Sequence, residues 1–359
     1  MLDDSLFDDA ARLADVDAGG LLRLAALSGA QVRAAMETAS EVGLDDLADG
    51  RPRALVLVAR PGVGPAVCRL LAALLGPRCP VPVVVAESIP AWIGALDVVF
   101  AHTDDVGDAV LAESISVACR RNATVVLAVP SDGPVAAAGA GRAKLLSPRV
   151  PVPPALSFAH VFAAGISTIA ALGLLTFDAE QLADELDREA ERAHPSHESL
   201  INPAKSLALR LADRTPLLWG IDPVSTAVAA HGAFALGSHA GVPSYVADYP
   251  QAATERALHR AAAAVGSEAD LFADPEDNPG ALLRVFLVSA RHDAQGEVFE
   301  RAATRDLPSA DLVTPGESVR ADAVLRSAAL ATRFDLAAVY LGLAAGTLNG
   351  PGWPALAVH

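Results

Sequence analysis

The sequence predicts an α/β fold made of two doubly wound domains. Residues 56–88 and 217–249 align without a gap at an offset of 161, and each copy has the pattern strand, polar turn, apolar helix, Gly-containing turn, strand. This pattern describes a βαβ unit, and such units form parallel sheets covered by helices. Near-continuous Val/Leu runs such as Ala54–Ala59 are typical of strands buried on both faces. A chain of 359 residues is also long enough for two cores.

Residues 1–51 are expected to form a helical lead-in. Apolar residues recur there at an approximately helical spacing, and Gly43 is a plausible helix stop. The first α/β domain is predicted over 52–150. Its strands are expected at Ala54–Ala59, Val81–Ala86, Asp97–Ala101, Thr124–Val129 and Lys144–Leu146, with helices over 65–75 and 106–121.

The segment 151–199 is expected to connect the domains. A stiff Pro-rich link, 148–154, precedes an apolar helix over 155–175 and a charged surface helix over 178–193 that Asp178 would cap. Residues 155–177 carry no charge and are long enough to span a bilayer, but their Ser, Thr, His and Gly content favours a buried helix at a domain or subunit interface.

A second α/β domain is predicted over 200–359. Its strands are expected at Pro216–Gly220, Pro243–Ala247, Leu283–Ser289 and Ala310–Thr314, followed by a long helix over 318–346. Parallel sheets of this kind bind ligands where strand carboxyl ends meet helix N-termini, so the loops after the strands are the candidate site loops.

Composition and charge exclude several classes of protein. The chain is 52% hydrophobic and carries a net charge of −16 without a dense basic block, which argues against nucleic acid and anionic membranes as partners. Three cysteines without metal-ligand spacing and an acidic N-terminal segment predict a reduced, cytoplasmic protein without a signal peptide. No cofactor or metal is expected, because Pro195 interrupts the one suggestive cluster, His194, His197 and Glu198.

The loop after the first strand contains two glycines, Gly62 and Gly64, beside Arg60. Such a loop is a weak indication of phosphate binding and is equally typical of a simple turn. No serine-hydrolase elbow, Walker A loop, Rossmann glycine triplet or HExxH motif is present in the sequence.

With its two βαβ repeats, the segments NPAKSLALRLADRTPLLWG at 202–220 and DLAAVYLGLAAG at 335–346, the sequence resembles the bifunctional phosphoglucose/phosphomannose isomerases. The resemblance implies two tandem sugar isomerase (SIS) domains and a homodimer. It also implies isomerisation of mannose 6-phosphate or glucose 6-phosphate to fructose 6-phosphate, which needs donors around the phosphate and a carboxylate base.

The resemblance also implies a set of substrate-binding residues. Arg60, Gly62 and Gly64 correspond to the family's Gly-rich turn, and 101–109, with His102 and Thr103, corresponds to its Ser/Thr-rich phosphate loop. That loop here carries three carboxylates, Asp104, Asp105 and Asp108. The repulsion between a carboxylate and a phosphate charge about 4 Å apart is roughly 4 kcal/mol. This is more than the about 0.3–2 kcal/mol by which a helix N-terminus stabilises a bound anion.

The family's catalytic residues are replaced. The position of its base Glu falls on Ser238, beside His239, and the position of its His falls on Thr254, beside Glu255. The C-terminal segment WPALAVH contains no Lys. His239 and Glu255 are therefore the candidate catalytic residues, with Ser238 and Thr254 as substrate contacts; the alternative is that they are ordinary surface or loop residues. His231 is expected to be a core histidine.

These observations predict a SIS-fold protein that binds a sugar phosphate and has weakened or lost catalysis. Two alternatives stay open. One is an active aldose–ketose isomerase with relocated catalytic residues. The other is a non-catalytic scaffold or regulatory partner in mannose metabolism.

Overall fold

The chain divides into two compact units in a computed structural model, which describes residues 2–264, 283–292, 294–317, 319 and 322–348. The first unit comprises residues 27–187, and the second comprises residues 1–26 together with 188–359. The boundary falls inside α8 (Ala179–Arg192).

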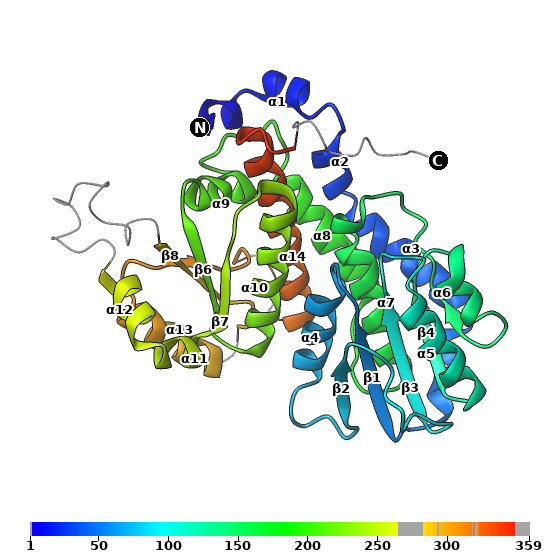
Figure 1. Ribbon diagram of the computed structural model, residues 1–359. Helices are drawn as coiled ribbons and strands as arrows, with labels where there is room; N and C mark the ends of the chain where they lie inside the picture. Colours follow the sequence, from blue (N-terminus) through cyan, green and yellow to red (C-terminus); the bar gives the residue numbers. More distant parts are fainter. Residues whose placement is uncertain (1, 265–282, 293, 318, 320–321, 349–359) are drawn as a thin grey trace. The chain divides into compact units, whose positions relative to one another are not determined.

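The first unit contains a five-stranded parallel sheet in the order β2-β1-β3-β4-β5 (Figure 1). Its strands are β1 (Ala54–Ala59), β2 (Val83–Ala86), β3 (Asp97–His102), β4 (Thr124–Ala128) and β5 (Lys144–Leu145). All six residues of β3 are buried. The near-continuous apolar pattern of the central strands is therefore explained, as predicted, by helices that cover both faces of the sheet.

Two groups of helices cover this sheet. The first group is α3 (Ser28–Glu41), α4 (Gly64–Leu75) and α7 (Phe158–Ala171), which pack on one another; the second is α5 (Ala109–Arg120) and α6 (Gly133–Ala138). Helix α3 ends before Gly43, whose φ of 65° is left-handed and suits glycine. Helix α5 begins where Asp108 accepts a hydrogen bond from the Leu111 amide.

The apolar stretch expected to connect domains instead belongs to the first unit. Helix α7 is 14 residues long, too short for the about 20 residues that a bilayer span needs. It packs on α3 and α4, and a Cβ at Gly165 would lie 2.3 Å from a methyl group of Leu71. The apolar composition is thus explained by packing within the unit, and the homodimer stays a prediction.

The second unit contains a four-stranded parallel sheet in the order β7-β6-β8-β9. Its strands are β6 (Thr215–Gly220), β7 (Tyr245–Asp248), β8 (Leu283–Val288) and β9 (Asp311–Val313). Its helices are α1 (Ala10–Val16), α2 (Leu21–Ala25), α9 (Pro203–Leu211), α10 (Pro223–Ala235), the π-helix η4 (Leu236–Ala240), α11 (Tyr249–Thr254), α12 (Arg256–Ala264), α13 (Ala294–Asp306) and α14 (Ala323–Ala344).

Helix α14 is the central helix of the second unit. It packs on α2, α9, α10 and η4, and each of its residues from Val324 to Ala344 is buried. By length and composition it could cross a membrane, but its apolar window is entirely buried inside the structure.

The structure confirms the repeat and most predicted elements. Strands β1 and β6 have the same length and lie 161 residues apart, as the alignment predicts. The predicted strands all appear, with ends shifted by up to two residues. The long terminal helix is present from Ala323, while part of its predicted start, at 318 and 320–321, lies outside the described residues.

The helical lead-in predicted over 1–51 is divided between the units. Helices α1 and α2 belong to the second unit, where the Asp3 amide donates to the carbonyl of Ala344 and α2 packs on α14. Helix α8 is capped by Asp178 as expected, but one of its faces is buried, including Leu182 and Leu186. It is therefore amphipathic rather than fully solvated.

Candidate functional site

The carboxyl edge of the first sheet is the natural place for a ligand. In the order β2-β1-β3, strand β1 lies between the two strands that follow it in the sequence. The chain therefore passes from one side of β1 to the other, and such a switch point opens a crevice at the carboxyl ends of β1 and β3. The loop after β1 holds Arg60, Gly62 and Gly64, and the loop after β3 holds Thr103 and Asp104. Most of the predicted substrate-binding residues therefore converge here.

Arg60 is bound to another protein side chain rather than free for an anion. Its Nε donates to Asp108 at 2.6 Å, and its Nη1 donates to the carbonyl of Glu87 at 3.1 Å. Burial acts to raise the pKa of Asp108, but hydrogen bonds from Leu111 and Arg60 outweigh it and lower that pKa below its usual value. Asp108 is thus a carboxylate at neutral pH, and the charge of Arg60 is compensated.

Asp104 occupies the space in front of the Gly62 turn. Gly62 has a φ of 108°, a conformation that favours glycine, and a Cβ there would lie 2.1 Å from Oδ2 of Asp104. Gly64 is less restricted, since its Cβ would make only an ordinary contact of 3.7 Å with the ring of His102. The turn expected to hold a phosphate therefore faces a protein carboxylate.

His102, the last residue of β3, lies beside this carboxylate. Its Nδ1 donates to the carbonyl of Ala128 at 2.6 Å, and its Nε2 lies 3.3 Å from Oδ1 of Asp104. This Nε2 has no hydrogen-bond partner among the described residues. Thr103 is buried, and its hydroxyl accepts a hydrogen bond from the Asp105 amide at 3.1 Å, so it closes its own loop.

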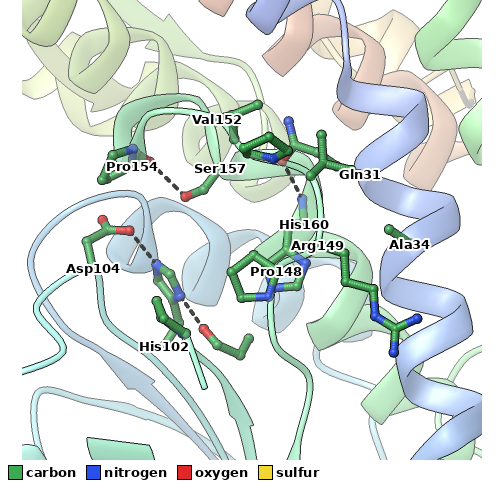
Figure 2. Close-up of a pocket in the computed structure, with 14 residues that line it drawn as sticks. Gln31, Ala34, His102, Asp104, Pro148, Arg149, Val152, Pro154, Ser157 and His160 are labelled. Atoms are coloured by element: carbon green, nitrogen blue, oxygen red, sulfur yellow. Dashed lines mark hydrogen bonds and ion pairs between the residues drawn. The ribbon is translucent and has the colours of Figure 1, made fainter. Parts of the chain in front are cut away.

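A cavity of about 240 Å³ lies beside His102 and Asp104 (Figure 2). Figure 2 shows the polar side chains that line it, which come from α3, the end of β3 and the loop after it, the proline-rich segment after β5, and the start of α7. They are Gln31, His102, Asp104, Arg149, Ser157 and His160. Four prolines, Pro130, Pro148, Pro151 and Pro154, supply much of the apolar wall.

His160 is a site residue that the sequence did not reveal. Its side chain is 4% exposed, and its Nε2 has no hydrogen-bond partner among the described residues. Burial lowers its pKa to about 4, helped by the nearby ring of His102 and opposed by a hydrogen bond with the backbone of Leu146. The imidazole is therefore neutral at physiological pH. Because Nε2 is the ring nitrogen without a partner, we assign the Leu146 bond and the proton to Nδ1, which leaves a free lone pair on Nε2.

Gln31 holds this histidine in place from α3. Its Oε1 accepts a hydrogen bond from the backbone amide of His160 at 3.2 Å, and its Nε2 donates to the carbonyl of Leu156 at 3.1 Å. The sequence signals for this arrangement were a histidine inside an uncharged segment and a glutamine within a predicted helix. That the glutamine is 1% exposed is seen only in the structure. Neither indicates a site without the tertiary structure.

The predicted catalytic residues lie in the second unit and do not line this cavity. His239 is 1% exposed within η4, where burial lowers its pKa. Glu255 accepts a hydrogen bond from the hydroxyl of Tyr245 at 2.6 Å. Ser238 is half-buried beside His239, and the hydroxyl of Thr254 donates to the carbonyl of Gln251 in its own helix.

His231 is a core histidine, as expected. It is fully buried on α10, and its Nε2 lies 2.8 Å from Oδ1 of Asp335 on α14.

No group of three or more His, Cys, Asp or Glu side chains within the described ranges could hold a metal ion.

The carboxyl edge of the second sheet is closed by hydrogen bonds. The hydroxyl of Ser225 donates to Asp222 at 2.8 Å and accepts from the Ala290 amide, just after β8, at 2.9 Å. Two arginines of α14 bind the same edge: Arg326 donates to the carbonyl of Ala290, and Arg333 donates to the carbonyl of Thr314, which follows β9.

Comparison with known proteins identifies the class of fold. The structure is similar to the C-terminal domain of glucosamine-fructose-6-phosphate aminotransferase from Francisella tularensis, with a TM-score of 0.62 at 8% identity over 93% of this chain and 98% of that one. It is also similar to tagatose-6-phosphate ketose/aldose isomerase from Escherichia coli, with a TM-score of 0.61 at 10% identity over 93% of this chain and 95% of that one. The similarity to glucosamine-6-phosphate deaminase from Thermotoga maritima has a TM-score of 0.54 at 10% identity, over 87% of this chain and 93% of that one.

The sequence adds a family match. Residues 200–347 match the model of the bacterial phospho-glucose isomerase C-terminal SIS domain. The chain therefore has an α/β fold like that of these proteins, and the part that matches the SIS-domain family lies in the second unit. No curated protein matches the sequence.

Proposed function

We propose that this chain is a SIS-fold protein that binds a carbohydrate derivative and has lost the isomerisation of mannose 6-phosphate and glucose 6-phosphate to fructose 6-phosphate. The observation that carries the proposal is the Asp104 carboxylate against Gly62, which fills the space where the resemblance to phosphoglucose/phosphomannose isomerases expects phosphate. A phosphate charge about 4 Å from it would be opposed by roughly 4 kcal/mol.

The charges around the turn support this proposal. Arg60, which lies in the same loop as the glycines, is paired with Asp108 at 2.6 Å. Binding a phosphate there would require both that ion pair and the contact between His102 and Asp104 to open. A fold that keeps its strand-end crevice while filling the phosphate position with carboxylates is better suited to binding another part of a sugar than to phosphosugar chemistry.

The alternative of an active isomerase with relocated residues has less support. General acid–base catalysis needs a group within about 3 Å of the proton that it moves. His239 is 1% exposed, and Glu255 is hydrogen-bonded to Tyr245. Neither residue is among those that line the cavity of the first unit.

An enzyme-coupled assay tests the proposal. The purified full chain is incubated with mannose 6-phosphate and separately with glucose 6-phosphate, and formation of fructose 6-phosphate is followed. We expect no turnover above a blank without protein, while an authentic isomerase in the same buffer shows full activity. Turnover that disappears in Glu255→Gln, with the fold intact by circular dichroism, would contradict the proposal and establish the relocated catalytic site.

A further inference from the structure

The cavity of the first unit offers a hydrogen-bond acceptor that no protein group uses. The neutral His160 ring lines the cavity with a lone pair on Nε2. This atom is buried and has no hydrogen-bond partner in the part of the chain that the structure describes. A buried polar atom without a partner costs about 1–3 kcal/mol. A ligand that donates a hydrogen bond here would recover that free energy.

The side chains that line the cavity supply no free cation. Four titratable or charged side chains line it: His102, Asp104, Arg149 and His160. Asp104 faces His102 at 3.3 Å, and Arg149 pairs with Glu41 and Glu37. His160 is neutral, so the cavity offers no free cation to an anionic ligand.

The remaining polar groups favour a ligand with hydroxyl groups. The hydroxyl of Ser157 donates to the carbonyl of Pro154 at 2.7 Å, which leaves its lone pairs free to accept. Proline rings and Val152 supply apolar surface next to these acceptors. A sugar presents this combination, because its hydroxyls donate hydrogen bonds and its C–H faces are apolar.

We propose that the cavity beside His102 and His160 binds an uncharged hexose, with Nε2 of His160 accepting a hydrogen bond from a sugar hydroxyl. The inference rests on the proposed carbohydrate-binding function and narrows the ligand from a carbohydrate derivative to an unphosphorylated sugar. The volume of about 240 Å³ is below the about 300–1,000 Å³ of pockets for drug-sized ligands, which suits one sugar ring.

Isothermal titration calorimetry of the full chain tests the inference. The probes are glucose, mannose and fructose, and separately their 6-phosphates. At least one of the free sugars is expected to bind, with each 6-phosphate at least tenfold weaker than its parent sugar. His160→Phe removes the acceptor and is expected to weaken binding at least tenfold.

A second variant keeps the test valid if His160→Phe fails to fold. Val152→Trp adds bulk at a partly exposed residue of the cavity wall while keeping both histidines, and it is expected to abolish binding. The matched control is Val110→Trp, because Val110 is an exposed valine of the same unit, on α5, that does not line the cavity. It is expected to bind as the unmodified chain does.

The outcomes separate the two proposals. Binding of a 6-phosphate in preference to its free sugar would overturn the uncharged-hexose inference and leave the loss of catalysis standing. Failure of all six probes to bind, or binding that Val152→Trp leaves unchanged, would also overturn it. Turnover in the coupled assay would overturn the proposed function, whatever the calorimetry shows.

Discussion

In the second unit the side chains at the carboxyl edge of the sheet bind one another, whereas in the first unit several of them face a cavity. Ser225 joins Asp222 to the Ala290 amide, and Arg326 and Arg333 of α14 bind the backbone that follows β8 and β9. In the first unit the corresponding edge ends at His102 and a cavity that His160 also lines. The order of the first four strands is the same, so topology offers a crevice and side chains decide whether it stays open.

The two edges differ in what they contribute. A network of hydrogen bonds such as that of the second edge stabilises a unit, because the buried polar groups that it joins have partners. A cavity with an unpaired nitrogen sacrifices stability for the capacity to bind. The comparison therefore predicts that substitutions at the second edge affect mainly stability and that substitutions at the first affect mainly binding.

The largest expected effect is that of Arg333→Met in the second unit. Arg333 donates to the buried carboxylate of Glu189 at 2.6 Å, and removing one partner of a buried ion pair typically costs about 3–5 kcal/mol. Urea unfolding would measure the loss in the free energy of unfolding. Arg260→Met, at an exposed arginine, is the control. A loss of less than about 1 kcal/mol would show that Arg192, the other partner of Glu189, suffices.

The second expected effect is the pH dependence caused by His160. Its folded pKa is about 4, below the unfolded value of about 6.5, so the unfolded chain takes up the proton first. The contribution is fully present above about pH 6.5 and is lost as the pH falls through about 4, amounting to about 3 kcal/mol at about 1.4 kcal/mol per pKa unit. Urea unfolding between pH 7 and pH 4 measures it. His160→Phe should flatten the curve, and an unchanged slope would contradict the assignment.

Ser225→Ala is expected to have the third largest effect. Its hydroxyl is fully buried and serves both Asp222 and the Ala290 amide, so the substitution leaves two polar groups short of a partner and should cost about 1–3 kcal/mol. Thermal unfolding would measure the change. Ser114→Ala, which removes a single hydroxyl bond on α5, should cost less. Equal losses would mean that the second edge is not the closed network described above.

Asp104→Ser should change stability least and binding specificity most. Replacing the carboxylate in front of Gly62 by a hydroxyl removes the repulsion and adds a donor, so glucose 6-phosphate should bind at least tenfold more tightly than to the unmodified chain. The free energy of unfolding should change by about 1 kcal/mol or less, since Asp104 is only partly buried. Calorimetry measures the affinity. Asp105→Ser, at the exposed neighbour, should leave phosphate binding weak.

Much of the fold could be predicted because it depends on local patterns. The apolar runs of β1 and β6 gave the repeat, and Asp178 and Gly43 marked helix ends with the residues that caps and stops require. The assignment of α1 and α2 to the second unit could not be predicted, because it depends on contacts with α14, more than three hundred residues away in the sequence.

The candidate site could be predicted only in part. Gly62, His102 and Asp104 follow strand ends, where local sequence and topology suffice to bring them together. His160 and Gln31 are joined across 129 residues by a hydrogen bond between α3 and α7, and no periodicity reports such a contact. His239 and Glu255 were selected by alignment to a family, which does not show whether a side chain is buried, as His239 is.

The proline segment beside the cavity has a consequence for the kinetics of binding. Each ring of Pro148, Pro151 and Pro154 fixes φ near −65°, so this wall has fewer accessible conformations than a segment without proline. Preorganisation of this kind lowers the conformational entropy that a ligand must remove. Association with the first unit should therefore proceed without a slow ordering step, and the wall's backbone should give nearly the same NMR spectrum before and after saturation.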